Sequence, residues 1–470
     1  MYFHCSSLAR PLVAAGIVAL AGCAGLPPDR GLPEVRTQLA ARGVRDLPAP
    51  DADGNSRLVD EILQQGPLGA DEATRVALLA NPRLRAEYAR LGFSAAEVYD
   101  AGRLANPTLS GAVLFTHTPG DLDRYDYGLT QNFLSLLLLP ARRRLAQAEF
   151  ERAQQQAGAA ILQLCGEVQA SYYRLVAAEQ VRELRQTVAG AARASADLAQ
   201  RYYDAGNIAA LDLELQRAAA GQAEAQAVSA ANEAVAARAE LGRLLGIPAE
   251  RQDWQVQNRL PAPLSKDDDA AALLALADRS RLDLAARRRE VATLQDALGV
   301  SRRYRFLGDV ELGVQGERDD DGAHLLGPAA SIQLPLFNQN QGGVLRAQAQ
   351  LERSQTELDA LQLDIGHSIE AARARLEAQR VLTERYRGEY IPLQESIVKH
   401  MQERTNAMLE GPFELIRARQ RQYDVDQAYL EAVRDYWLAR AELSRQVGAQ
   451  LPEAQAVSLS DAALAAAGGP

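Results

Sequence analysis

The feature that most constrains the fold is an internal repeat of about 200 residues. Four short segments of the first half recur, in the same order, in the second half. The matched pairs are 81–84 with 279–282, 146–152 with 347–353, 214–218 with 414–418, and 241–243 with 443–445. Self-similarity at a fixed spacing indicates a duplicated structural unit. We therefore expect two equivalent halves, each built from a helix, two strands, a very long helix and a return helix.

Two segments of each half have the period of two that is typical of a β-strand with one apolar face. In the first half, for example, Tyr125, Tyr127 and Leu129 alternate with polar or small residues. The predicted strands cover residues 108–116 and 125–136 in the first half and 308–317 and 329–337 in the second. Strands of about ten residues are long enough to cross a bilayer when tilted. Two soluble hairpins packed on helices are the alternative interpretation.

Four strands are too few to close a barrel, because outer-membrane barrels begin at about eight strands. An open sheet in lipid would leave the N–H and C=O groups of its edges unpaired, which is energetically unfavourable. Strands in a bilayer would therefore have to come from several copies of the chain to complete one barrel.

The helical segments are unusually long. A helix capped by Asp71 is predicted to run to about Gly102, and residues 141–203 contain no proline, which predicts a helix roughly 90–95 Å long. Positions 181, 184, 188, 191, 195, 198 and 202 step by three and four, as in a coiled-coil seam. In the second half a proline-free pattern runs from about Val344 to Pro392. Many seam residues are small or polar, which suits the wall of a water-filled tube, and a soluble coiled coil is the alternative.

The N-terminus has the proportions of a signal peptide. A basic residue, Arg10, precedes an apolar run that is too short to span a bilayer. Residues 20–23 (LAGC) resemble the bacterial lipobox, which implies that residues 1–22 are removed and that Cys23 is lipidated. The following Ala24 implies sorting to the outer membrane, and residues 23–70 are predicted to form a lipidated strap. An ordinary secretory signal is the alternative.

Several function classes are disfavoured by composition and motifs. The formal net charge is −10 and no stretch clusters Lys or Arg in the way that a nucleic-acid surface needs, which argues against a nucleic-acid partner. No phosphate-binding glycine loop or activated nucleophile can be assembled, so we predict that the chain is not an enzyme and has no cofactor. His117 and His324 lie at predicted outer loops without metal-ligand spacing, so no metal site is predicted. Cys165 follows Ile161 and Leu164, which predicts buried packing.

A lipobox, the twofold repeat and Gly/Asn turns between long helices together resemble the TolC family of outer-membrane efflux proteins, in its lipoprotein branch. The resemblance extends from about residue 71 to residue 448. It implies a mainly α fold with a small transmembrane β part. Long antiparallel helical hairpins would form a trimeric α-barrel tunnel in the periplasm, joined to a shared 12-stranded outer-membrane β-barrel. The implied function is a passive duct that docks with a periplasmic adaptor protein and an inner-membrane transporter.

The resemblance also implies roles for residues near the helix turns. Gly206, Asn207, Asn406 and Met408 would contact the adaptor. Acidic residues just past the second turn ring the closed entrance in the family, and the matching positions are Glu214 in the first half and Glu414 in the second. Arg417 stands where the family often has a second acid. A Glu414–Arg417 pair between neighbouring chains would then close the gate, and a solvated pair on one helix is the alternative.

The predicted domain organisation follows the repeat. Residues 71–245 form the first efflux-protein repeat, 246–269 an inter-repeat insert in the equatorial region, 270–448 the second repeat, and 449–470 a flexible tail. The alternative is a different class of function. The chain would then be a lipid-anchored periplasmic coiled-coil scaffold or adaptor that does not span the membrane.

Overall fold

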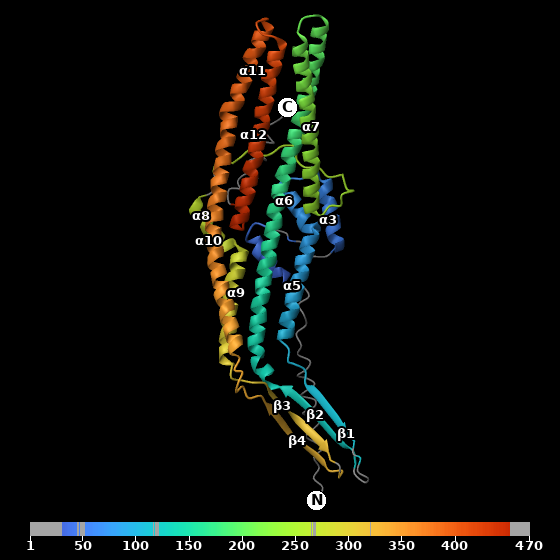
Figure 1. The fold of residues 1–470 in the computed structure, drawn as a ribbon, viewed down its shortest axis with the longest axis vertical. Helices are drawn as coiled ribbons and strands as arrows, with labels where there is room; N and C mark the ends of the chain where they lie inside the picture. Colours follow the sequence, from blue (N-terminus) through green and yellow to red (C-terminus); the bar gives the residue numbers. More distant parts are fainter. Residues whose placement is uncertain are drawn as a thin grey trace. The chain divides into compact units, whose positions relative to one another are not determined.

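The computed structural model describes residues 31–44, 47, 52–115, 117, 122–264, 266, 269–319 and 321–451. The predicted signal peptide, Cys23 and the tail beyond Leu451 lie outside the described residues. The elements (Figure 1) are α2 (Leu32–Ala40), α3 (Ala52–Gln64), α4 (Ala70–Ala80), α5 (Pro82–Ala101), β1 (Thr108–Leu114), β2 (Arg124–Asn132), α6 (Phe133–Asp204), α7 (Ala210–Leu245), α8 (Ala270–Ser280), α9 (Leu282–Arg303), β3 (Val310–Arg318), β4 (His324–Ile332), α10 (Gln341–Arg385), η1 (Tyr386–Tyr390), α11 (Ile391–Asn406) and α12 (Pro412–Val447). The chain is therefore mainly helical, as predicted.

The chain divides into two compact units, which we describe separately. The first comprises residues 1–33, 89–154 and 293–349. Its centre is one antiparallel sheet with the strand order β1-β2-β3-β4. The hairpins β1–β2 and β3–β4 come from the two repeats, and the pairing of β2 with β3 joins them (Figure 1). Within the described residues, β1 and β4 are the edges of this sheet.

The register gives the sheet two chemically different faces. Leu129 lies opposite Leu109 on β1 and opposite Val314 on β3, so these three side chains share one face. The larger apolar side chains on this apolar sheet face are Leu109, Val113, Tyr125, Tyr127, Leu129, Leu312, Val314, Leu326 and Ile332. The other face carries mostly polar or small residues, including Thr130 and Gln315. Every one of the nine apolar side chains is exposed in the single chain.

Three predicted strands extend too far, and the one predicted at 108–116 is β1, which ends at Leu114. The strand predicted at 125–136 ends at Asn132, because the Asn132 side-chain oxygen accepts a hydrogen bond from the Ser135 N–H at 2.7 Å and caps α6. Residues 133–136 are therefore the first turn of α6. The strand predicted at 329–337 is β4, which begins at His324 and ends at Ile332. Pro335 has no N–H to continue the ladder.

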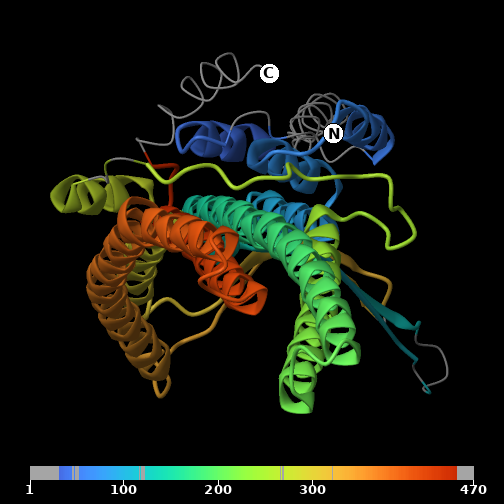
Figure 2. The ribbon, with the colours of Figure 1, turned by 90° about the horizontal axis from the view of Figure 1, so that it is seen from above.

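The second unit comprises residues 34–88, 155–292 and 350–470. It contains two helical hairpins, one formed by α6 and α7 and the other by α11 and α12 (Figure 2). With 72 residues, α6 is longer than predicted, at roughly 108 Å. No helix among the described residues is both long and apolar enough to cross a bilayer.

The first hairpin closes through small residues. Ala189 and Ala192 of α6 pack against Ala220 and Ala223 of α7, and all four are buried. The predicted seam positions 191 and 198 are wrong by one residue, because Ala192 and Ala199 are the buried positions and Ala191 is exposed. A straight α-helix has 3.6 residues per turn, so its buried stripe drifts away from a strict repeat of 3.5.

Each repeat begins with two short helices rather than the single helix predicted after Asp71. α4 is capped by Gly69, whose N–H donates to Glu72 Oε2 at 3.1 Å, so Asp71 is not the cap. The break between α4 and α5 falls at Asn81, the residue before a proline, which disfavours helical backbone there. The equivalent break between α8 and α9 falls at Arg281.

Both breaks hold the end of a return helix. The Asn81 side chain donates to the Leu244 carbonyl at 2.6 Å, and the Arg281 guanidinium donates to the Gln446 carbonyl at 2.7 Å. Both carbonyls are among the last four of α7 and α12, which have no partner within their own helix. The next residues, Gly246 and Gly448, are left-handed with φ of 73° and 74°. The structure therefore pairs Asn81 with Arg281, 200 residues apart, and Gly246 with Gly448, 202 residues apart. The sequence match had paired residue 81 with residue 279, which is two residues too early.

The long helix of the second repeat is interrupted by a single π turn. It is α-helical through α10, becomes a π-helix at Tyr386–Tyr390 (η1), and continues as α11 through Pro392. The Ile391 N–H donates to the Tyr386 carbonyl, five residues back. Pro392 has no N–H and its ring would crowd the preceding turn of an α-helix, so the wider turn accommodates it. The helix therefore does not end at Pro392.

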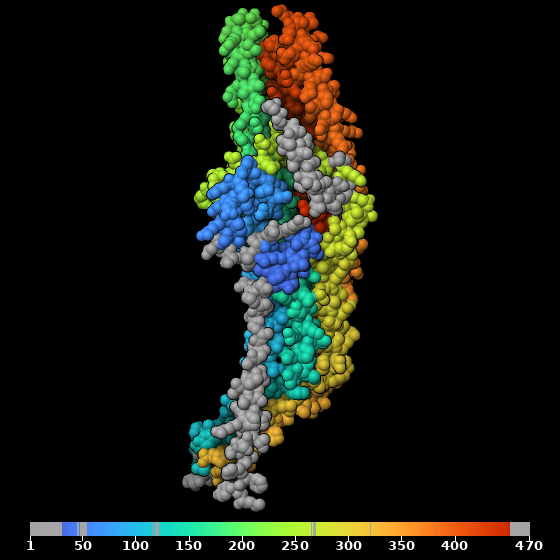
Figure 3. Space-filling view, turned by 180° about the vertical axis from the view of Figure 1, so that it is seen from behind, coloured from blue at the N-terminus to red at the C-terminus, as the bar shows by residue number. Residues whose placement is uncertain are grey.

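The inter-repeat insert, 246–269, is anchored to the second unit in its described residues. Leu68 forms a parallel bridge with Val256, and Trp254 is buried beneath the Arg238 guanidinium, 4.1 Å from the ring centroid. Further along, the Trp437 indole N–H donates to the Pro261 carbonyl at 2.8 Å. Helices α3 and α4 lie on the surface of the same unit (Figure 3, blue). The insert is thus a structural strap across both repeats.

Candidate functional sites

The helix tips of the two hairpins are built alike. In the first, the Asn207 N–H donates to the Tyr202 carbonyl at 2.8 Å and Gly206 is left-handed with φ of 74°. In the second, the Leu409 N–H donates to the Arg404 carbonyl at 2.9 Å and Met408 takes the left-handed position with φ of 60°. Both are Schellman turns, which satisfy the last carbonyls of a helix. Methionine at the second turn is strained relative to glycine.

The second tip presents apolar side chains to solvent. Met408 is 94% exposed, and Leu409 beside it is also exposed. On the first tip, Leu211 and Leu215 of α7 are exposed. The two tips touch through Tyr202 and the Phe413 ring, which meet edge to face with centroids 6.0 Å apart. Gly206 and Asn207 lie in the turn of the first tip. Asn406 is the last residue of α11, and Met408 lies in the turn of the second tip. These positions remain predicted adaptor contacts.

The positions of the two turns show which residue of the first repeat is equivalent to Glu414. Glu414 lies six residues after left-handed Met408, and Asp212 lies six residues after left-handed Gly206. Asp212 Oδ2 accepts from the Ala209 N–H at 3.2 Å. Glu214, which the sequence match had paired with Glu414, lies two residues further along its helix. Asp212 is therefore the structural counterpart of Glu414.

The predicted gate pair forms within one chain. The Arg417 guanidinium donates to the Glu414 carboxylate on the same helix, at a spacing of three residues. Both side chains are exposed, so this pair alone contributes little to stability. The exposed Glu214 side chain makes no ion pair among the described residues. The geometry in the single chain is thus that of the solvated surface pair.

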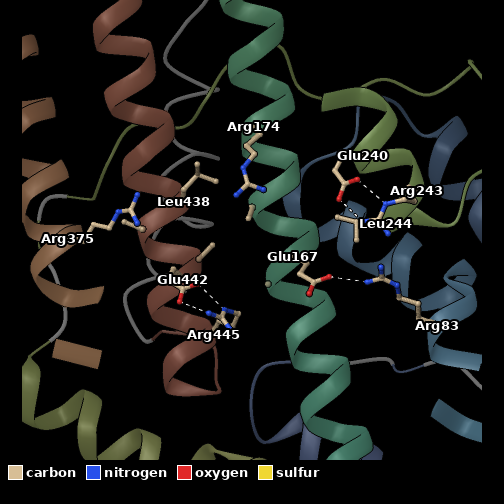
Figure 4. A pocket seen from close by; sticks show the side chains of 14 residues that line it. Arg83, Glu167, Arg174, Glu240, Arg243, Leu244, Arg375, Leu438, Glu442 and Arg445 are labelled. Atoms are coloured by element: carbon tan, nitrogen blue, oxygen red, sulfur yellow. Dashed lines mark hydrogen bonds and ion pairs between the residues drawn. The ribbon is translucent and has the colours of Figure 1, made fainter. Parts of the chain in front are cut away.

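A charged groove that sequence reasoning missed lies in the second unit. Side chains from α5, α6, α7, α10 and α12 surround a cavity of about 610 Å³ (Figure 4). Its charged lining residues are Arg83, Arg174, Arg243, Arg375 and Arg445, with Glu167, Glu240 and Glu442. A signal was present in the sequence, because each of the matched segments 241–243 and 443–445 ends in an arginine that follows a glutamate by three residues.

Ion pairs organise the carboxylates of this arginine groove. Arg243 pairs with Glu240 at 2.5 Å, and Arg445 pairs with Glu442 at 2.6 Å. The hydrogen bond from Arg243 is the main reason that the pKa of Glu240 lies below its usual value. The hydrogen bond from Arg445 does the same for Glu442. Both carboxyl groups are therefore ionised at neutral pH.

Cys165, His117 and His324 are the remaining residues that the sequence singled out. Cys165 is buried, and burial raises the pKa of its thiol to about 12, so the thiol is protonated and unreactive. His117 and His324 belong to no cluster: the described part of the chain contains no group of three or more His, Cys, Asp or Glu side chains placed to hold a metal ion.

The described part of the chain combines long helical hairpins, a duplicated unit and a sheet with an exposed apolar face. Residues 74–247, the first repeat, match the family of outer membrane efflux proteins. The first repeat is therefore an outer membrane efflux protein domain.

Among curated proteins, the chain is similar to the cobalt-zinc-cadmium resistance protein CzcC of Cupriavidus metallidurans. The two are 24% identical over 332 residues, which cover 70% of this chain and 77% of that protein. Among solved structures, a membrane protein from Pseudomonas aeruginosa matches with a TM-score of 0.70 at 17% identity, covering 81% of this chain and 92% of that one. The Campylobacter jejuni CmeC outer membrane channel matches with a TM-score of 0.69 at 15% identity, covering 83% and 88%.

Proposed function

We propose that this chain is the outer-membrane channel of a tripartite efflux pump, a passive trimeric duct that carries substrates from the periplasm to the exterior. The observation that carries the proposal is the four-stranded sheet. Nine large apolar side chains lie exposed on one of its faces, and β1 and β4 each pair on one side only within the described residues. In water such a sheet would expose a large apolar face, and in lipid its edges would leave backbone N–H and C=O groups unpaired, so it is unfavourable in both.

Association of copies removes both problems at once. If β1 of one copy pairs with β4 of the next, every edge group gains a partner and the apolar face turns outward to lipid. Three copies of a four-stranded sheet supply twelve strands, above the minimum of about eight for an outer-membrane barrel. The polar face, which includes Thr130 and Gln315, then lines the lumen. The helical hairpins would continue the duct into the periplasm as the trimeric α-barrel.

The partners and the anchor follow from the same proposal. The exposed apolar tip around Met408 and Leu409 suits docking with a periplasmic adaptor, which connects the duct to an inner-membrane transporter. The channel itself needs no cofactor or catalytic group, because the energy comes from the transporter. Lipidation of Cys23 would hold the mature N-terminus at the outer membrane, since each buried CH₂ of an acyl chain contributes about 0.8 kcal/mol.

A labelling experiment separates the duct from a periplasmic scaffold. In a Cys165→Ala background, we introduce Ala323→Cys beside the β3–β4 turn or Met408→Cys at the second tip; both positions are exposed. We expect a membrane-impermeant maleimide to label Ala323→Cys in intact cells, because a duct brings this turn to the exterior. Met408→Cys should label only after the outer membrane is permeabilised.

The two positions control for each other, because both carry an accessible thiol and only their side of the membrane differs. If Ala323→Cys also requires permeabilisation, the sheet does not cross the outer membrane and the chain is a scaffold. Labelling of both thiols in intact cells would indicate a damaged envelope, which the leakage of a periplasmic enzyme would reveal.

The gate residues have a separate test. We propose that Glu414 and Arg417 also contact neighbouring copies when the entrance is closed. Replacing both with alanine should raise the closed-state conductance in planar bilayers about threefold or more, because an exposed pair contributes ~0.2–1 kcal/mol and three copies act together. The matched control is Glu149→Ala with Arg152→Ala, an ion pair of the same spacing on α6. Equal conductance in both double variants would remove Glu414 and Arg417 from the gate.

A further inference from the structure

The arginine groove carries an excess of positive charge, whereas the whole chain is acidic. The whole protein carries a formal charge of −10, yet the groove is lined by five arginines and only three glutamates. All of its lining residues belong to the second unit. A concave site with an excess of one sign of charge concentrates ions of the opposite sign. The groove is therefore a local exception in an acidic protein.

Two of the five arginines have no carboxylate partner. Arg174 on α6 and Arg375 on α10 are exposed and make no side-chain hydrogen bond or ion pair among the described residues. They extend into the groove with the other labelled side chains (Figure 4). The remaining three arginines are each held by a glutamate. Five guanidinium N–H donors on each unpaired arginine are thus available to a ligand.

The unpaired arginines occupy equivalent places in the two repeats. Arg174 stands close enough to Glu240 that its charge contributes to the lowered pKa of that carboxyl, after the larger effect of Arg243. Arg375 stands in the same relation to Glu442, after Arg445. Each repeat therefore supplies one Glu–Arg pair and one unpaired arginine, and the two sets face a common cavity. A ligand that spans both sets would meet donors from two sides.

We propose that the arginine groove binds a small soluble molecule that bears at least two oxyanion groups, phosphate or carboxylate, bridging Arg174 and Arg375. Guanidinium groups match such oxyanions because their planar fork can donate two parallel hydrogen bonds. The cavity of about 610 Å³ falls within the range of small-molecule sites, roughly 300–1,000 Å³. The proposal is independent of the duct function, because binding can be measured without transport.

Calorimetric titration of the purified, detergent-solubilised protein with inorganic pyrophosphate tests this site in the absence of lipid. We expect saturable binding at constant ionic strength. The double variant Arg174→Gln, Arg375→Gln should bind pyrophosphate at least about tenfold more weakly, since charge-assisted hydrogen bonds from two sides are lost. The variant Arg174→Lys, Arg375→Lys should be intermediate, because it keeps the charges but not the planar forks.

The matched control is Arg201→Gln with Arg346→Gln. These arginines lie on the same two helices, are exposed, and make no side-chain ion pair among the described residues, but they are outside the groove. The control removes the same charge and should change the affinity less than about twofold, because charges more than about 10 Å away are screened at 0.1 M salt. Equal weakening in both double variants, or a wild-type signal that does not saturate, would overturn the proposal. Unchanged circular dichroism confirms that the variants are folded.

Discussion

Replacing Leu129 and Val314 with arginine should prevent the chain from assembling in the outer membrane. The two side chains face each other across β2 and β3 at the middle of the apolar sheet face, where they are 50% and 49% exposed. In the proposed barrel this face contacts lipid. Arginine at the bilayer midplane costs about 2–4 kcal/mol for each residue, and a trimer would carry six of them. We expect the unsubstituted chain in outer-membrane fractions to migrate as a multimer on semi-denaturing gels, and the arginine variant to lack this band.

The control for this prediction is the opposite face of the same two strands. Thr130 and Gln315 are the chain neighbours of Leu129 and Val314, and their side chains belong to the polar sheet face. The variant Thr130→Arg, Gln315→Arg adds the same charge on the proposed lumen side, so it should still assemble. If both double variants assemble equally well, the apolar sheet face does not contact lipid. If neither double variant assembles, the size of the arginine side chain prevents assembly on both faces, and the result does not depend on which face contacts lipid.

Gly246→Ala should produce the largest loss of stability among the glycine variants of the helix ends. Gly246 is left-handed with φ of 73°, which costs roughly 1–2 kcal/mol for a residue with a side chain. In addition, a Cβ at this position would lie 2.6 Å from the Ala80 carbonyl oxygen, at the break between α4 and α5. The Ala80 carbonyl is part of the backbone, so the ends of α7 and α4 must move apart to make room for the Cβ. This movement adds about 1–3 kcal/mol to the loss of stability. Urea unfolding followed by circular dichroism measures the sum.

Two other glycines make this a graded series. Gly206 has φ of 74° but open space around its Cβ position, so Gly206→Ala should lose only the conformational part, about 1–2 kcal/mol. Gly448 is the counterpart of Gly246, and its Cβ would lie 3.0 Å from Arg281 Cγ and 3.2 Å from Arg281 Cα. These approaches are less severe than the 2.6 Å at Gly246, so Gly448→Ala should fall between the two. A loss for Gly246→Ala no greater than that for Gly206→Ala would show that the helix end can shift away from Ala80.

The fold was readable from the sequence wherever one local pattern dominates. Alternation placed all four strands, and the turns at Gly206 and Asn406 were located because glycine and asparagine interrupt long helical patterns. Strand ends were less accurate. The segment after Asn132 is as apolar as a strand, but it is the first turn of α6, and the Asn132 side chain caps it by accepting from the Ser135 N–H. An apolar run that short fits a strand or a helix, so its pattern alone did not place the boundary.

The candidate sites were harder to predict because they depend on exact counting between repeats. Matching by residue identity paired Glu214 with Glu414, whereas the turn geometry pairs Asp212 with Glu414. Asp and Glu have the same charge, so identity was a poor guide at this position. The arginine groove was missed for a different reason. Its members come from five helices that only the packing of the second unit brings together, and an arginine on a helix surface looks like ordinary solvated charge.

The π turn at Tyr386–Tyr390 reconciles two repeats of unequal length. The spacing between matched positions is 201 residues before it, as for segments 146–152 and 347–353, and 202 after it, as for Gly206 and Met408. One surplus residue in a regular helix would rotate everything beyond it by about 100°. The π turn takes up the extra residue, so the side chains before and after it keep facing the same directions as in the first repeat. A duplication that has drifted in length thus still delivers matching hairpin ends.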